Sequence, residues 1–333
     1  MGWTDLFKSK KGPDLKPDPR IRWFGKLPTY ADYYTSPSDA DWAAEMNEWL
    51  MKGYEIYHSR ALSRSDTSGI EARAGTDRLP LAGCVLRLPK SGMTAFASIQ
   101  DYGGDMRGRH FPICFYVGYP TALWPAPSSG QVGEAVRTVD ALMELRNDVA
   151  QHFRSPGRFE SRFGDREVDL GGFEENGDAD WRDKAKKIEM SEWFAAIRPA
   201  LKIEDTAEWY RTLQSWGQNI STCDGESFEP TFRFPLAAAM QLEPQVTGWV
   251  RWLERRMDLK SRFLSLMLTS GEIEGVNYFT VIARPLVADD FLLVTSLGST
   301  VSYVDDLTAL GARGESTDGD KQLPRDWEGF VEG

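Results

Sequence analysis

The stretch Asp105-Met106-Arg107-Gly108-Arg109-His110-Phe111-Pro112 (105–112) is the one from which we infer the fold. It follows a glycine pair at 103–104 and precedes a strand-like apolar run, so we expect its charges at the mouth of a sheet. Gly108 lies between two arginines, where glycine lets the chain take a positive φ or approach another backbone closely. We expect Phe24-Gly25-Lys26-Leu27-Pro28 (24–28) to lie beside this stretch in space.

Three interpretations of this stretch stay open. It can be an internal Asp–Arg brace, or a recognition site whose guanidinium groups bind a partner's carboxylate or phosphate. It can also be an acid–base site that pairs Asp105 with His110, although the sequence places no nucleophile beside them. We therefore expect a partner-binding site and no enzyme activity. The candidate site residues are Lys26, Asp32, Asp105, Arg107, Arg109 and His110.

Composition restricts the class of protein. The 333 residues are 41% hydrophobic and 12% aromatic, which is enough to fill a core and excludes wholesale disorder. The formal net charge is −11, and no basic run occurs that could neutralise the phosphates of a nucleic acid. We therefore expect a protein partner and no nucleic acid.

Motifs for cofactors and metals are absent from the sequence. It has no HExxH, Gly-x-Ser-x-Gly, GxGxxG or EF-hand pattern. The Gly25-Lys26 pair is no P-loop, because Arg20 stands where the first glycine is needed and Leu27 where Ser or Thr is needed. We expect no cofactor and no metal.

Cysteine usage and hydropathy predict a cytoplasmic protein. Cys84, Cys114 and Cys223 are odd in number and widely spaced, which fits neither a disulfide framework nor a CxxC site. No apolar run reaches the length of a membrane span, and residues 1–7 lack the apolar core of a signal peptide.

The pattern along the chain predicts two α/β halves. We expect a flexible arm at 1–19, an α/β domain at 20–160, a charged linker or insertion at 161–190, a second half at 191–312 and a polar tail at 313–333. The linker is predicted because 13 of the 24 residues at 164–187 are charged, a density that we expect cannot bury a face. Each half can be written as a strand, a tryptophan-rich helix, three strands and a helix, which raises the hypothesis of two related modules.

Local signals set the expected elements. Strands are expected at 21–24, 79–88, 93–100, 111–119, 232–235, 263–268, 278–283 and 291–295. Helices are expected from a capping box at 38–41 to residue 57, at 131–153, around 193–197 and 209–216, at 244–257 and at 305–310. A loop is expected at 60–77, and the tail from Gly311 onward is expected to be loose.

Several short motifs resemble a known family. The chain carries, in order, Gly25-Lys26-Leu27-Pro28, Ala31-Asp32-Tyr33, Trp49-Leu50 and Asp105-x-x-Gly108-Arg109-x-Phe111-Pro112. This order resembles the TagF (ImpM) family, which is associated with type VI secretion, over residues 21–120 and more weakly over 234–253. Ala31 and Tyr33 stand where the family has glycine and phenylalanine, so the turn geometry there departs from the pattern.

The resemblance implies a fold and a function. The implied fold is an α/β sandwich, a sheet flanked by helices and related to longin or roadblock domains. The implied function is that of a non-enzymatic cytoplasmic regulator, a post-translational repressor that acts by protein contact, often through a forkhead-associated scaffold protein. Recruitment to the inner-membrane face of the apparatus goes with this function. The alternatives are a structural or adaptor subunit of the same apparatus and a hydrolase that uses Asp105 and His110.

Overall fold

The computed structural model describes residues 16–37, 40–68, 79–124, 129–152, 156–170, 177–201, 205–223, 230–259, 264–270, 275–295, 301, 304–307 and 324–332. Parts of several predictions fall outside these residues, among them the arm at 1–15, the capping residue Ser38, the loop at 69–77, the linker at 171–176, the last helix at 308–310 and the tail at 313–323.

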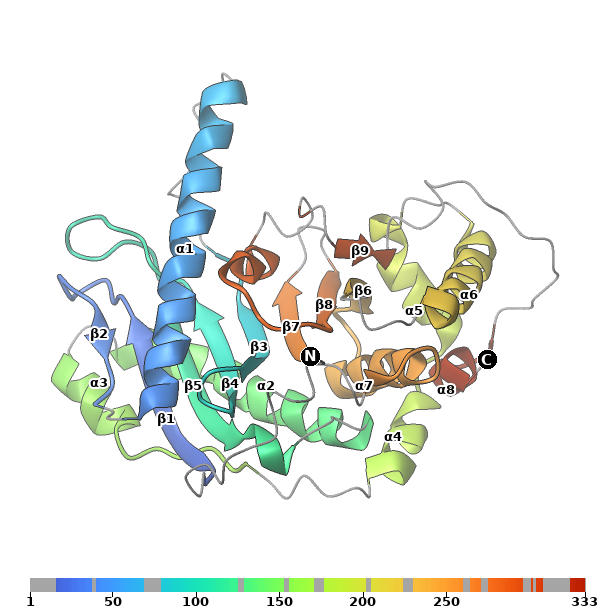
Figure 1. The fold of residues 1–333 in the computed structure, drawn as a ribbon, viewed down its shortest axis with the longest axis horizontal. Helices are drawn as coiled ribbons and strands as arrows, with labels where there is room; N and C mark the ends of the chain where they lie inside the picture. Colours follow the sequence, from blue (N-terminus) through green and yellow to red (C-terminus); the bar gives the residue numbers. More distant parts are fainter. Residues whose placement is uncertain are drawn as a thin grey trace, which may run out of the picture.

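A nine-stranded sheet forms the middle of the molecule, with the order β2-β1-β5-β4-β3-β7-β8-β6-β9 (Figure 1). The strands are β1 (Asp18–Gly25), β2 (Tyr34–Thr35), β3 (Ala82–Leu88), β4 (Met93–Gln100), β5 (Ile113–Pro120), β6 (Thr231–Ala237), β7 (Ser265–Ser270), β8 (Val276–Ile282) and β9 (Val304–Asp306). Their pairings are antiparallel except for that of β6 with β9.

Helices cover both faces of this sheet. The α-helices are α1 (Asp41–Ser68), α2 (Ser129–His152), α3 (Pro156–Phe163), α4 (Gly177–Ala185), α5 (Met190–Ile197), α6 (Thr206–Cys223), α7 (Leu242–Glu254) and α8 (Trp327–Glu332). The short 3-10 helices are η2 (Thr121–Leu123), η3 (Arg198–Ala200) and η5 (Ala288–Val294). Helix α1 and η5 pack on one face, and α2 to α8 pack on the other, so the expected α/β sandwich is confirmed.

Two apolar clusters, one on each face, explain why the central strands are buried throughout. In β5, Phe115 belongs to the cluster under α2, whereas Cys114 and Tyr116 belong to the cluster under α1. Because successive strand residues point to opposite faces, both faces need apolar side chains. Cys84 and Cys114 are buried free thiols, which pack as small apolar residues.

The two halves share one continuous sheet. Residues Ala82–Val85 of β3 pair with Leu266–Thr269 of β7, which joins β1–β5 to β6–β9 without a break. In the second half, α7 is followed by two strands and then by η5, so the expected run of three strands is not formed there. The hypothesis of two related modules stays a prediction.

Helix α1 is longer than the sequence indicated. The loop expected from residue 60 is wrong as far as Ser68, because the helix continues to that residue and its end projects beyond the sheet (Figure 1). No glycine or proline occurs between Gly53 and Gly69, and polar residues alone do not end a helix.

The charged segment 161–190 does bury a face, so that part of the linker prediction is wrong. Trp181 and Ala185 lie one turn apart in α4, and both are buried against the core together with Ile188, which follows the helix. The Trp181 indole donates to the Pro244 carbonyl at 3.0 Å. Two apolar residues one turn apart, with a third just after the helix end, suffice to seat a short helix whose other positions are mostly charged.

Two expected elements near the C-terminus have another type. Phe291 and its apolar neighbours form the 3-10 helix η5 rather than a strand, and Phe291 packs on Trp49 of α1 at 5.7 Å. Asp290 starts this helix, because its carboxylate accepts the Val287 N–H at 2.9 Å. Residues Val304–Asp306 form strand β9, where a helix was expected.

The end of the polar tail is a buried helix, which corrects its expected looseness there. In α8, Trp327, Phe330 and Val331 are fully buried among the aromatic rings of α5, α6 and α7. The Trp327 indole donates to the Pro244 carbonyl at 3.0 Å. No described helix is long and apolar enough to cross a membrane.

Candidate functional site

The end of β1 and the 105–112 stretch lie side by side, as predicted. Phe24 of β1 is paired with Cys114 of β5, which directly follows the stretch. At Gly25 φ is +152°, and a Cβ added there would lie 2.1 Å from the Pro112 carbonyl oxygen. Only glycine permits this close approach of the two backbones. The contact of Gly25 with Pro112 therefore fixes 24–28 against 105–112.

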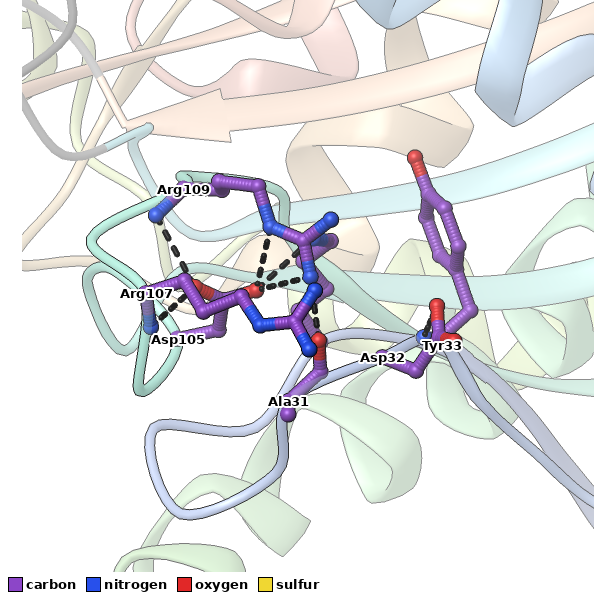
Figure 2. A network of polar contacts seen from close by, with 7 residues as sticks. Ala31, Asp32, Tyr33, Asp105, Arg107 and Arg109 are labelled. Atoms are coloured by element: carbon purple, nitrogen blue, oxygen red, sulfur yellow. Dashed lines mark hydrogen bonds and ion pairs between the residues drawn. The ribbon is translucent and has the colours of Figure 1, made fainter.

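Asp105 closes the loop 105–109 through backbone hydrogen bonds. Its Oδ1 accepts the backbone N–H groups of Arg107 at 2.8 Å and Arg109 at 2.9 Å (Figure 2). The Asp105 N–H donates to the Arg109 carbonyl at 3.0 Å, and the Gly108 N–H donates to the Asp105 carbonyl at 2.9 Å. Gly108 has φ +72°, which glycine adopts without strain. We call residues 105–109 the braced loop.

A buried ion pair anchors the braced loop to the end of β1. Lys26 Nζ lies 2.8 Å from Asp105 Oδ2, and the two side chains are 4% and 0% exposed. Arg109 donates to the same oxygen from Nε at 3.0 Å and from Nη2 at 2.9 Å. The Arg109 guanidinium also donates to the Ala31 carbonyl, which ties the braced loop to the loop that carries Asp32. Five donors therefore converge on one carboxylate.

These donors keep Asp105 ionised. Burial would raise the pKa of the Asp105 carboxyl, but the hydrogen bonds from Lys26 and from the Arg109 and Arg107 N–H groups outweigh burial. The pKa is therefore held well below its ordinary value. A buried carboxylate that already accepts several hydrogen bonds and has a low pKa is suited to hold a loop. It is not suited to take a proton from a substrate.

An aromatic cluster lies beside the ion pair, and the sequence analysis did not single it out. Lys26 Nζ lies 5.0 Å from the centre of the Tyr33 ring. Tyr33 stacks on Phe24 at 5.3 Å, nearly parallel, and meets Phe111 edge-on at 5.0 Å. Tyr54 of α1 contacts Phe111 at 4.8 Å, which connects this cluster to α1.

Tyr33 is held in this cluster but remains 39% exposed. Burial raises its pKa, and the negative charges of Glu55 and Asp32 raise it further, so the hydroxyl is protonated at neutral pH. One feature of the sequence could have drawn attention to Tyr33: it is a tyrosine where the TagF (ImpM) family pattern has phenylalanine.

The side chains of Asp32, Tyr33, Met106, Arg107 and Arg109 are exposed, and we call them the exposed face. Arg107 makes no side-chain hydrogen bond or ion pair within the described part of the chain, whereas its backbone N–H donates to Asp105. Asp32 accepts the Tyr33 N–H at 2.9 Å through Oδ1. Met106 is 70% exposed, far more than a methionine with a structural role needs to be.

His110 does not pair with Asp105. Its Nδ1 is buried without a hydrogen-bond partner among the described residues, and both Asp105 oxygens accept other donors. Asp101, another acid near the loop, accepts the Gly103 N–H at 2.7 Å and the Leu79 N–H at 2.9 Å. The acid–base pair that the hydrolase alternative requires is therefore not formed.

The structure thus divides the six predicted site residues by accessibility. Lys26 and Asp105 lie inside, so they organise the site and do not reach a partner directly. Asp32, Arg107 and Arg109 are exposed beside them, and His110 is half-buried. In the ranges that the structure describes, no group of three histidine, cysteine, aspartate or glutamate residues is arranged to hold a metal ion.

Comparison with known proteins gives a slight structural likeness. No family model matches the chain, and no curated protein matches it. A crystal structure of PA0076 from Pseudomonas aeruginosa PAO1 is similar with a TM-score of 0.37 and 12% sequence identity. That match covers 91% of this chain and all of the other. A likeness of this size carries no argument about function.

Proposed function

We propose that the chain is a non-enzymatic accessory regulator of a bacterial type VI secretion system. It restrains the apparatus after translation, and it acts by protein contact through the exposed face. A forkhead-associated scaffold protein is the partner that the resemblance suggests, and the cytoplasm is the expected location, with recruitment to the inner-membrane face of the apparatus.

The observation that carries this proposal is the meeting of the two motifs on which the resemblance rests. Gly25 and Lys26 of the first motif contact Pro112 and Asp105 of the second. Their role in this chain is structural, because they make the brace that holds Arg107 outward. A rigid loop whose arginine side chain has no hydrogen bond or ion pair among the described residues, together with an anchored and exposed tyrosine, is typical of a surface that binds a protein.

The geometry gives the hydrolase alternative no support. Asp105 is buried under five donors, and His110 is not bonded to it. The absence of an enzyme activity is itself part of the proposal, and a broad phosphatase and esterase screen of the purified chain tests it. We expect no turnover above the buffer control.

Deletion of the gene in the native host tests the proposed function. We expect secretion through the apparatus to increase, because a restraint is lost, and a plasmid copy of the wild-type chain to restore the lower level. A copy with Arg107→Ala should fail to restore it at equal abundance. Arg198→Ala serves as the matched control, because Arg198 is an exposed arginine on η3 in the other half.

The outcomes separate the rival roles. Loss of secretion on deletion would identify a structural or adaptor subunit and reject the repressor. Unchanged secretion would reject both. Full restoration by the Arg107→Ala copy would keep the regulator but remove the exposed face from its mechanism.

A further inference from the structure

We infer that the partner segment that binds the exposed face carries a carboxylate next to an apolar side chain. This inference rests on the proposed function and adds the chemistry of the partner. It follows from how charge, apolar area and rigidity are distributed over the five exposed side chains.

The charges of the site favour an acidic group. Lys26 and Asp105 form a buried ion pair, which leaves Arg107 and Arg109 as the exposed cations of the braced loop, in a chain whose net charge is −11. Asp105 is saturated by internal donors, so it cannot neutralise Arg107. A planar guanidinium with no internal partner binds a carboxylate through two parallel hydrogen bonds.

The apolar part of the surface is supplied by Tyr33 and Met106. Tyr33 is 39% exposed and Met106 is 70% exposed, and both lie on segments that Arg109 ties together. Tyrosine and arginine are among the residue types that dominate binding energy at protein interfaces. Methionine fits apolar groups of varied shape because its side chain is flexible and polarisable.

The acids bordering the face set the orientation of the partner. Asp32 is bonded to the Tyr33 N–H, and the charges of Glu55 and Asp32 act on the Tyr33 hydroxyl against that of Arg109, so the exposed acids of the site lie on the Tyr33 side. A partner carboxylate is repelled there and belongs at Arg107. Apolar atoms of the same segment then meet Tyr33 and Met106.

The brace reduces the entropy that binding costs. The backbone of Arg107 is fixed through Asp105, and the Tyr33 ring is packed against Phe24, Phe111 and Lys26. Side chains that are already positioned lose less freedom when a partner binds.

Photocrosslinking from Tyr33 tests the inference. The full chain with Tyr33→p-benzoylphenylalanine is produced in the native host, irradiated, and the crosslinked peptide identified by mass spectrometry. The same amino acid at Leu123, which is 55% exposed on η2, is the matched control for non-specific adducts. We expect one segment, specific to position 33, with an Asp, a Glu or a free C-terminus beside apolar residues.

Two further variants read the charge directly. Arg107→Glu should lower the crosslink yield at least about tenfold, as expected for a hot-spot arginine. Asp32→Asn should raise the yield, because it removes a repelling charge and keeps the oxygen that accepts the Tyr33 N–H. If the site had a purely structural role, Arg107→Glu and Asp32→Asn would not change the crosslink yield in opposite directions.

Secretion from the same strains separates the two failures. A crosslinked segment without carboxylates, or a crosslink yield unchanged by Arg107→Glu, would overturn the inference. If the chain still restrains secretion in these strains, the proposed function as a regulator stands. No position-specific adduct from Tyr33 would also overturn the inference. If the chain then fails to restrain secretion as well, the proposed function falls with it.

Discussion

At the scale of single residues, Asp105 is the group on which the site depends. Asp105→Ala should lower the free energy of unfolding by about 3–5 kcal/mol, because Lys26 is left buried without its counter-charge. Lys26→Met should cost less, about 1–3 kcal/mol, since Asp105 keeps its four donors from the braced loop. Urea unfolding of both variants measures the difference. An equal or larger cost for Lys26→Met would show that Asp105 is not the hub.

The lowered pKa of Asp105 predicts a pH dependence of stability. The unfolded carboxyl has a pKa of about 4 and the folded one titrates below it, so the unfolded state takes up the proton first. The stabilisation is therefore complete above this value and is lost as the pH falls through the folded pKa. The stability difference between the wild type and Asp105→Asn should shrink from pH 6 to pH 3. A difference that stays constant over this range would contradict the ionised brace.

Gly25 tests the close approach of the two motifs. Gly25→Ala should cost about 3 kcal/mol, because the new methyl group meets the Pro112 backbone at a positive φ. Gly108→Ala also has a positive φ but open space around it, so its cost should stay near 1–2 kcal/mol. Gly157→Ala, in α3 with no atom nearby, is the control and should be close to neutral. Equal costs for Gly25→Ala and Gly108→Ala would show that the contact with Pro112 is unimportant.

Much of the site at this scale was predictable, but not its division into inner and outer groups. The glycines, the carboxylate and the cations stand in two short motifs, so their meeting could be inferred. The buried Lys26 lies against the Tyr33 ring, which packs on Phe24 and on Phe111 of a separate segment. A motif does not encode which of its charges the rest of the fold covers.

At the scale of elements, helix α8 is the clearest test of how the second half is held together. Trp327→Ala should destabilise the protein by about 3–5 kcal/mol, because it empties a fully buried position that contacts the rings of Trp193, Trp249 and Phe330. Trp327→Phe should cost less, since a ring remains and Trp181 still donates to Pro244. Thermal unfolding of the two variants gives the order. A negligible effect of Trp327→Ala would mean that the tail is as loose as its sequence indicated.

Element types were predictable where the apolar pattern was long and failed where it was short. The pattern of α2 extends over more than five turns, and its prediction is confirmed. The run at Phe291 is four residues long, which fits a strand or a 3-10 helix equally well. Packing on Trp49 of α1 decides the matter, and that contact spans more than 200 residues of sequence.

At the scale of the whole molecule, the β3–β7 pairing determines whether the halves can exist apart. A fragment of residues 16–163 would expose the edge of β3 along Ala82–Val85, together with apolar side chains that the second half covers. Open apolar strand edges promote aggregation. We expect this fragment to aggregate or to lack a cooperative unfolding transition in circular dichroism. A folded, monomeric fragment would establish 20–160 as an independent domain.

The central claim is that the brace exists to hold Arg107 toward another protein. The most direct measurement is the amount of partner recovered with the tagged chain from its native host, normalised to bait and quantified by mass spectrometry. The account predicts at least a tenfold loss for Arg107→Ala and no change for Arg198→Ala, with both variants melting like the wild type. Equal partner recovery with all three chains would contradict it.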